Sequence, residues 1–428
     1  MFLPAKPSSR PLRVPREIAA LLRALQLGRP DASQLHALTD TEWKSLLEFS
    51  DLAHLTLSLA QLDQQGFPDW VRHRLEKNLA DNAARFDLVV NTYQEAAAAL
   101  ELAGVDYLVL KGFTQSPEYV PGPRLRMQSD LDLYCPQEEV PEARAALEAL
   151  GYVSDDQMDY SHADHVPTLY RKGRWTWRGN MFDPEMPLSI ELHFCLWNEA
   201  ELLFPAPQID TFWNRKKTRT LENISFPALD PIDQLGYTSL HILRDLLTAD
   251  WMIHHVYELA FFLHHHAHDH AFWTRWKELH PERLRQLQAV AFFLARDWFG
   301  CNLSAENKTQ IHRLPAEILQ WLERFSGSPI EGMFKQNKTM LWMHTALLGT
   351  SGRKWPLVRH KLLPVIKPRI NSPSLKWSYR RPRKIRHLPP RLRYLVHFAS
   401  RIFTHTRLVP ATLFQGLVWK FHASRLPE

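Results

Sequence analysis

The first part of the chain alternates apolar and polar positions with the period of a helix. In "TEWKSLLEFSDLAHLTLSLAQL", residues 41–62, apolar side chains recur at three- and four-residue intervals, which predicts amphipathic helical structure. The Ala-rich run "DNAARFDLVVNTYQEAAAALELAG", residues 81–104, predicts a further helix that closes at Gly104, since glycine readily takes the left-handed conformation found after helix ends. Residues 16–79 are therefore expected to form a small helical unit.

The pattern then changes to short apolar runs bounded by glycine and proline. "VDYLVLKG", residues 105–112, predicts a buried strand, and "SDLDLY", residues 129–134, predicts a second one. An amphipathic helix is predicted over residues 137–151, and two more strands are predicted within residues 169–179 and 188–197. This order of elements predicts a mixture of α and β structure, that is, an α+β fold.

Helical patterns return from Pro231 onward, and prolines become frequent after Trp355. We therefore expect the chain to divide into an N-terminal helical segment, a catalytic α+β domain, a helical domain, and a basic Pro/Arg-rich tail that ends in an amphipathic helix. The expected limits are 1–80, 81–228, 229–350 and 351–428.

Two aspartates interrupt the apolar run of the second strand. Alternate residues of a strand share a face, so Asp130 and Asp132 point one way while Leu131 and Leu133 point to the core. Carboxylates this close repel each other unless they are solvated, protonated or bridged by a cation, and hard oxygen ligands suit Mg²⁺ or Mn²⁺. A metal site is the sharper interpretation, and a solvated edge strand is the simpler one.

Neighbouring residues favour the metal. The alternation of "SIELHF" places Glu191 and His193 on one face of the last strand, so that Glu191 could complete a three-carboxylate site. His193 is a candidate base or orienting group, with a hydrogen-bonded core histidine as the alternative. Gly112 would let backbone amides approach phosphate oxygens, and Lys111 could add a point charge.

Histidines are also frequent between residues 254 and 270. The pairs His264/His268 and His266/His270 have the i, i+4 spacing that can chelate a metal on a helix. Histidines at the boundary of an amphipathic helix are more often solvated or hydrogen-bonded, and no cysteine pattern accompanies these. We therefore expect no metal site there.

Composition sets the cellular context. The chain has 428 residues, of which 45% are hydrophobic, and its three cysteines have no C-x-x-C spacing. Neither a disulfide framework nor a zinc knuckle is indicated, and a reducing cytoplasm fits best. No apolar stretch approaches the roughly 20 residues that would span a bilayer, and the N-terminus lacks the apolar core of a signal peptide.

Charge is distributed unevenly along the chain. Residues 353–428 contain 18 Lys and Arg against one acidic residue, a net charge of +17, and the total of +6 leaves −11 for the preceding residues. Such a tail can bind an anionic membrane surface, which would place the protein at the inner face of the membrane. It can also bind RNA, or fold back on the acidic body. Charge alone does not choose among these partners.

The ordered set "LVLKG", Tyr119, "RMQSDLDLYCPQEEVPEARAALEALGY" and "IELHF" resembles a bacterial family of uncharacterised nucleotidyltransferases. That family is related to the minimal nucleotidyltransferases and shares the catalytic fold of DNA polymerase beta. The resemblance covers roughly residues 40–300. It implies a polymerase-beta-like domain with a mixed sheet, in which Asp130 and Asp132 bind catalytic metal. It also implies that Gly112 lies in the nucleotide-holding turn and that Arg126 helps to hold phosphate. Lys111 and Ser129 are further candidate nucleotide-binding residues.

Two departures from the wider superfamily stand out. Phe113 follows Gly112 where Gly-Gly or Gly-Ser is usual, and Glu258 occupies what looks like an Asp position on a later helix. We expect a cytoplasmic enzyme that uses Mg²⁺ or Mn²⁺ to move a nucleoside monophosphate from an NTP, such as ATP, to an unknown acceptor, with release of pyrophosphate. The alternative is a catalytically inactive nucleotide- or RNA-binding accessory protein.

Overall fold

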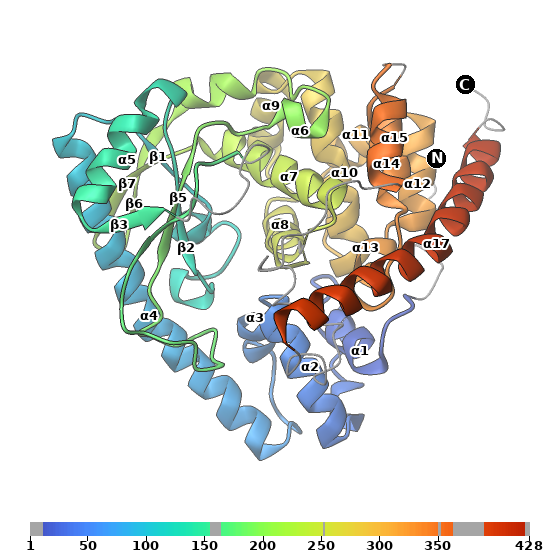
Figure 1. Cartoon of the computed structure of the whole chain (residues 1–428), viewed down its shortest axis with the longest axis horizontal. Coiled ribbons are helices and arrows are strands. Elements are labelled where there is room, and N and C mark those ends of the chain that lie inside the picture. The colour runs from blue at the N-terminus through green and yellow to red at the C-terminus, as the bar shows by residue number, and fades with distance from the viewer. Residues whose placement is uncertain (1–11, 155–163, 251–252, 350–351, 363–388, 424–428) are drawn as a thin grey trace. The chain divides into compact units, whose positions relative to one another are not determined.

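The computed structural model describes residues 12–154, 164–250, 253–349, 352–362 and 389–423 (Figure 1). The chain forms two compact units. The larger comprises Pro15–Asp245 and Asp250–Arg313, and the smaller comprises Met1–Val14, Leu246–Ala249 and Leu314–Glu428. The four segment limits expected from the sequence stay predictions, and the Pro/Arg-rich part of the tail, residues 363–388, lies outside the described residues.

The larger unit begins with helices, as the sequence pattern predicted. These are α1 (Arg16–Ala24), α2 (Asp40–Leu52), α3 (Thr56–Ala60) and α4 (Asp69–Leu102). Helix α2 starts at a capping box, in which the Thr39 side chain accepts from the Glu42 amide and the Glu42 carboxylate accepts from the Thr39 amide. Helix α4 runs without a break through residue 80, and Gly104 follows it with a φ of 72°.

A mixed five-stranded sheet follows in the described part of the chain, with the order β1-β2-β5-β4-β3. Its strands are β1 (Leu108–Leu110), β2 (Asp130–Tyr134), β3 (Tyr152–Ser154), β4 (Leu169–Arg171) and β5 (Ser189–His193). Strands β2 and β5 are parallel neighbours, and the other pairings are antiparallel. The two strands that carry the acidic residues, β2 and β5, therefore lie side by side in the interior of the sheet.

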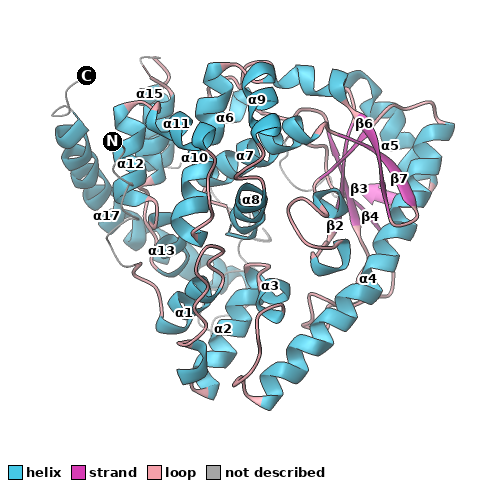
Figure 2. Ribbon diagram, turned by 180° about the vertical axis from the view of Figure 1, so that it is seen from behind, coloured by secondary structure: helices cyan, strands magenta, loops and turns pink. Residues whose placement is uncertain are grey.

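One face of this sheet is the core of the larger unit. Apolar side chains of β2 and β5 pack there against α4 and against α5 (Val140–Ala149), which lie together over the strands (Figure 2). Leu131 and Ile190 are fully buried in this layer. The hairpin β6 (Lys217–Leu221) and β7 (Ile224–Ala228) extends the core beside β1. The acidic residues consequently point to the opposite face.

Helices make up the rest of the larger unit. They are α6 (Glu199–Leu202), α7 (Pro231–Thr248, whose last residues belong to the smaller unit), α8 (Ile253–His265), α9 (His270–Leu279), α10 (Glu282–Phe299) and α11 (Ala305–His312). Short 3₁₀ turns occur at Leu35–Ala37, Gly112–Gln115, Pro123–Leu125, Gln137–Glu139 and Ile209–Arg215. The mixed sheet and the flanking helices confirm the predicted combination of α and β structure.

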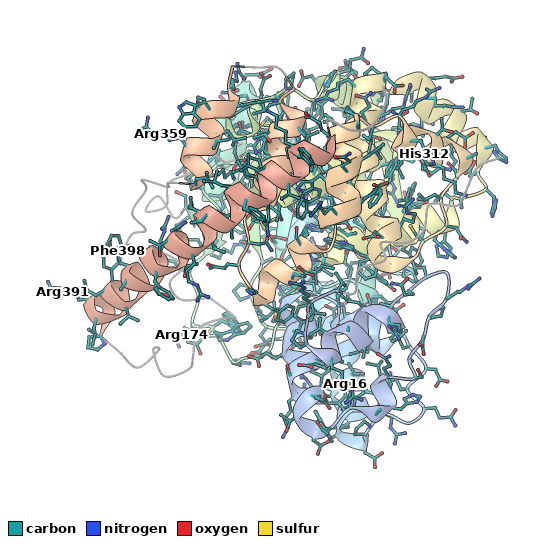
Figure 3. The ribbon with its side chains drawn as sticks, turned by 90° about the vertical axis from the view of Figure 1, so that its right-hand side faces the viewer. Arg16, Arg174, His312, Arg359, Arg391 and Phe398 are labelled. Carbon is teal, nitrogen blue, oxygen red and sulfur yellow. The ribbon has the colours of Figure 1, made fainter. Side chains whose placement is uncertain are left out.

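The smaller unit is helical. It contains α12 (Ala316–Phe325), α13 (Ser328–Phe334), α14 (Met340–Leu347), α15 (Lys354–Leu362) and α17 (Pro390–Ala423). Figure 3 shows Arg391 and Phe398 projecting from the N-terminal half of α17. Among the described residues, no helix has both the length and the apolar character needed to cross a bilayer.

Candidate active site

The acidic face of the sheet is built by two parallel strands in register. Asp132 of β2 and Glu191 of β5 are direct neighbours across the strand pair, and Asp130 lies one pleat before Asp132 on the same face. Asp132 is buried, whereas Asp130 and Glu191 are half-buried. The fold thus brings together the three carboxylates that the sequence pattern singled out.

Two cations share one oxygen of the buried aspartate. The Nζ of Lys111 lies 2.7 Å from Oδ1 of Asp132, and Nε2 of His193 donates to the same oxygen at 2.9 Å. Burial alone would raise the pKa of Asp132, but these two partners hold it well below its ordinary value. Asp132 is therefore a permanent carboxylate, and its Oδ1 already has two donors.

Asp130 is compensated less, because Lys111 and Arg126 offset only part of the rise in its pKa. Burial raises the pKa of Asp130 from 3.8 to about 7, and the neighbouring charges of Asp132 and Glu191 add to the rise. The pKa values of the two aspartates on this strand are therefore shifted in opposite directions. A cation placed between them would remove the repulsion that now falls on Asp130.

The turn after β1 differs from the expected open phosphate loop. Lys111 and Gly112 both have positive φ angles, 47° and 54°, and a non-glycine residue in that region stores backbone strain. A Cβ on Gly112 would lie 2.4 Å from Nε2 of Gln128, so a larger residue would have to displace the end of that side chain and would also adopt a strained positive φ. Phe113 is buried in the core, where its ring contacts those of Tyr93 and Phe226.

His193 is held by a carboxylate that the sequence pattern did not reveal. Its Nδ1 lies 3.6 Å from Oδ2 of Asp164, which is in turn ion-paired with Arg244 of α7. Burial disfavours the charged imidazolium, but the carboxylates of Asp132 and Asp164 raise the pKa of His193 to about 9. This raised pKa and the contact with Asp132 favour an orienting group over a base, and the role of His193 stays a prediction.

Helix α4 fixes the entrances to both acidic strands. Asn82 donates to the carbonyl of Arg126 at 3.2 Å, just before β2. Arg85 is fully buried and donates to the carbonyl of Gln128 at 2.9 Å and to that of Asp183, before β5, at 3.1 Å. One helix thus holds the loops that lead into β2 and β5. No sequence pattern indicated this role of Arg85.

The remaining predicted nucleotide-binding residues are placed as follows. Arg126 donates to Glu258 of α8 through Nε at 2.7 Å and through Nη2 at 3.4 Å, and both side chains are largely buried. Ser129 is half-buried directly before β2, where its carbonyl accepts from the Ser189 amide. The guanidinium of Arg126 therefore joins the sheet to a helix.

The residues present fit a divalent metal. Ligand atoms of Asp132, Glu191 and His193 lie within 4.8 Å of one another, and Asp130 lies on the same face of the sheet. Because His193 is protonated and donates to Asp132, the carboxylate oxygens are the suitable donors, and such hard ligands favour Mg²⁺ or Mn²⁺. The donor set of the three carboxylates thus matches the metal expected from the sequence.

A second group, His241, Asp245 and His255, has similar spacing but a different hydrogen-bond pattern. Arg244 donates to Nε2 of His241 at 2.9 Å, so the proton of a neutral imidazole lies on Nδ1, which faces Asp245 at 3.2 Å. His255 is also 3.2 Å from Asp245. Through these contacts the group connects α7 to α8.

The histidine pairs at i, i+4 spacing do not form a ligand set. Within the part of the chain that the structure describes, neither His264/His268 nor His266/His270 belongs to a group of three or more potential ligands. Nδ1 of His264 accepts from the Asn302 amide, and His266 contacts Glu118 at 2.8 Å. His264 and His266 are therefore hydrogen-bonded, as the sequence analysis expected for histidines at this position.

A parallel strand pair with carboxylates on one face and a lysine beside them defines a site suited to phosphate and metal chemistry. A model of the uncharacterised nucleotidyltransferase family matches residues 39–300, and the chain belongs to this family. The match confirms the resemblance to the uncharacterised nucleotidyltransferases and its extent of roughly residues 40–300. The bacterial origin and the kinship with DNA polymerase beta stay predictions. No curated protein and no solved structure matches the chain.

Proposed function

We propose that the protein is a cytoplasmic, metal-dependent nucleotidyltransferase that moves a nucleoside monophosphate from an NTP to an acceptor. The observation that carries this proposal is the placement of Asp130, Asp132 and Glu191 on one face of two adjacent strands, inside the region that defines the family. This arrangement also supports kinship with the DNA polymerase beta-like superfamily, because paired carboxylates on a central strand serve metal-assisted phosphoryl chemistry there.

The reaction would be an in-line displacement at the α-phosphorus of the NTP. An oxygen of the acceptor forms a bond to phosphorus, the bond to the bridging oxygen of the β-phosphate breaks, and pyrophosphate leaves with the bonding electrons. The acceptor loses its proton to a carboxylate of the site or to solvent. A bound Mg²⁺ or Mn²⁺ would neutralise the phosphate charge and lower the pKa of the acceptor hydroxyl.

Each protein residue has a separate task in this proposal. Asp130, Asp132 and Glu191 would hold the metal, and Lys111 would contact phosphate oxygens from the strained turn. His193 would keep Asp132 oriented through its 2.9 Å hydrogen bond. We retain Ser129 and Gly112 as nucleotide-binding residues. The ion pair with Glu258 favours a structural role for Arg126, in which it connects the segment before β2 to α8.

A second candidate function is that of a nucleotide- or RNA-binding accessory protein without turnover. One observation favours it, because Gly112 is covered by Gln128 and Phe113 is buried in the core. This turn therefore offers phosphate less open backbone than a Gly-Gly turn would. The three intact carboxylates favour the enzyme, since a binding protein does not need them.

The test is to incubate the full chain with each NTP labelled at the α-phosphate, Mg²⁺ or Mn²⁺, and a cell extract, and to follow pyrophosphate release and the destination of the label. Asp130→Asn and Glu191→Gln should lower turnover strongly without unfolding. Asp87→Asn, at a side chain that is 67% exposed, is the matched control and should be as active as wild type. Asp132→Asn is less informative because it leaves two buried cations without their partner.

The outcomes separate the two candidate functions. Label transfer that both active-site variants lose supports the enzyme. Tight NTP binding without pyrophosphate release, by a chain that melts cooperatively, supports the accessory protein. Wild-type turnover in Asp130→Asn would remove the metal assignment altogether.

A further inference from the structure

Helix α17 carries a row of large apolar side chains that are exposed. Six of them are more than half exposed: Leu395, Ile402, Phe403, Phe414, Leu417 and Phe421. At roughly 100° per residue, these six lie within an arc of about 120° on the helix. We call these six residues the apolar stripe. Scattered apolar residues are normal on a surface, but a continuous row on one helix face indicates a binding surface.

The helix packs on its own unit through a different face. Trp342 of α14 donates to the carbonyl of Thr412 at 3.1 Å, and Trp419 donates to the carbonyl of Glu317, in α12, at 3.1 Å. A Cβ on Gly416 would lie 2.2 Å from the Trp342 ring, so the helix approaches closely there. Thr412, Gly416 and Trp419 lie on the side of the helix away from the stripe. Leu395, Ile402, Phe403, Phe414 and Leu417 of the stripe therefore lie on a different side of the helix from these contacts.

Cations border the stripe. By the same helical spacing, Arg391 and Lys420 fall along one edge of the arc and Arg407 along the other, and all three are exposed. The chain around them, residues 353–428, has 18 Lys and Arg and one acidic residue. An apolar face edged by cations, on a segment of high positive charge, matches a surface whose outer layer is anionic and whose interior is hydrocarbon.

We propose that α17 docks on an anionic lipid surface, with the apolar stripe inserted between headgroups and the bordering cations on lipid phosphates. RNA would use the cations but would leave Leu395, Ile402 and Leu417 in water, because aliphatic side chains neither stack on bases well nor bind phosphate. A lipid interface accommodates both the apolar stripe and the cations that border it. Since no described helix is suited to spanning a bilayer, the helix lies in the plane of the interface.

The test measures binding of the full-length protein to vesicles of mixed phosphatidylglycerol and phosphatidylcholine, with pure phosphatidylcholine vesicles and a structureless single-stranded RNA as comparisons. Wild type should bind the anionic vesicles most tightly. Added salt should weaken this binding only in part, since charge contacts are screened and apolar insertion is not. The double variant Leu395→Gln/Leu417→Gln should lower the vesicle partition coefficient by about tenfold or more.

Two further variants separate insertion from general effects. Leu102→Gln, at a side chain of α4 that is 92% exposed, makes the same chemical change outside the stripe and should bind like wild type. Arg391→Glu/Arg407→Glu should weaken binding at low salt and reduce its salt dependence. All substituted residues are exposed, so unchanged melting curves are expected and confirm folding.

Four results would overturn the proposal. They are failure of wild type to bind anionic vesicles, equal binding by Leu395→Gln/Leu417→Gln and wild type, binding to RNA alone, and a dimer in sedimentation velocity that the same double variant abolishes. The last result would show that the stripe pairs with a second copy of the chain.

Discussion

Asp130→Asn should make the metal-free protein more stable while it lowers turnover. The substitution keeps the size of the side chain but removes one of three clustered negative charges. In the folded protein, burial and the charges of Asp132 and Glu191 raise the pKa of Asp130 to about 7. An acid whose pKa is higher in the folded state costs stability wherever the unfolded chain would ionise it.

The size of the effect follows from that pKa. A rise from 3.8 to about 7 corresponds to a ceiling of about 4 kcal/mol at ~1.4 kcal/mol per pH unit. Because Asp130 is only half-buried, solvent screens part of this cost, and we expect a gain of about 2 kcal/mol in the free energy of unfolding. The gain is absent below about pH 4, grows through neutral pH and is complete above about pH 7.

The assay is urea unfolding of wild type and Asp130→Asn in the presence of a chelator, at about pH 4 and about pH 8. Asp87→Asn is the surface control and should change little at either pH. Adding Mg²⁺ should then stabilise wild type and have a smaller effect on Asp130→Asn. Two results would contradict the inferred repulsion of Asp130 by Asp132 and Glu191. One is that Asp130→Asn is less stable than wild type at about pH 8. The other is that the difference in free energy of unfolding does not depend on pH.

Three other perturbations test the surroundings of the site. Lys111→Met should destabilise the fold by about 3 kcal/mol in urea unfolding, because Asp132 then keeps only His193, and it should also weaken NTP binding in calorimetry. Phe113→Ser should lower stability by about 4 kcal/mol without raising pyrophosphate release, because the Phe113 ring fills the core. His193→Gln should cost about 3 kcal/mol below pH 6.5, and the loss should vanish above about pH 9. The reason is that a pKa raised from 6.5 to about 9 stabilises the fold only while the folded state holds the extra proton.

Three outcomes would count against these arguments. Wild-type stability of Lys111→Met would show that the ion pair with Asp132 is not formed in solution. A gain of turnover in Phe113→Ser would mean that the turn rather than the core limits activity. A stability loss in His193→Gln that persists unchanged above pH 9 would point to lost packing and not to charge.

Strand alternation was sufficient to predict the acidic face. The period of two places Asp130 and Asp132 together, and it assigns Glu191 to the same side of its own strand. That the two strands are parallel neighbours in register could not be derived from either strand alone, because register depends on the pairing of distant segments. Local patterns predicted the helix over residues 81–104, but not that α4 begins at Asp69 as one helix.

The supporting residues were beyond such patterns. Asp164 precedes a short strand without any periodic signal, and its partner Arg244 is 80 residues away on a helix whose pattern shows only that it is amphipathic. The place of Gly112 in a nucleotide-holding turn stays a prediction, and the sequence did not show that the side chain of Gln128 lies against this glycine. Arg244 and Asp245 do stand out as charged residues within the apolar run "ILRDLL", residues 242–247, but this pattern does not identify their partners.

Helix α4 limits how the catalytic region can be isolated. Its 34 residues extend for about 51 Å as one continuous rod, and Asn82 and Arg85 reach the entrances of β2 and β5 from its middle. A fragment that begins at residue 81 would place Asn82 in the first turn, whose amides lack partners and which frays, and Arg85 directly after it. A recombinant fragment should therefore begin no later than Pro68, with the whole helix included.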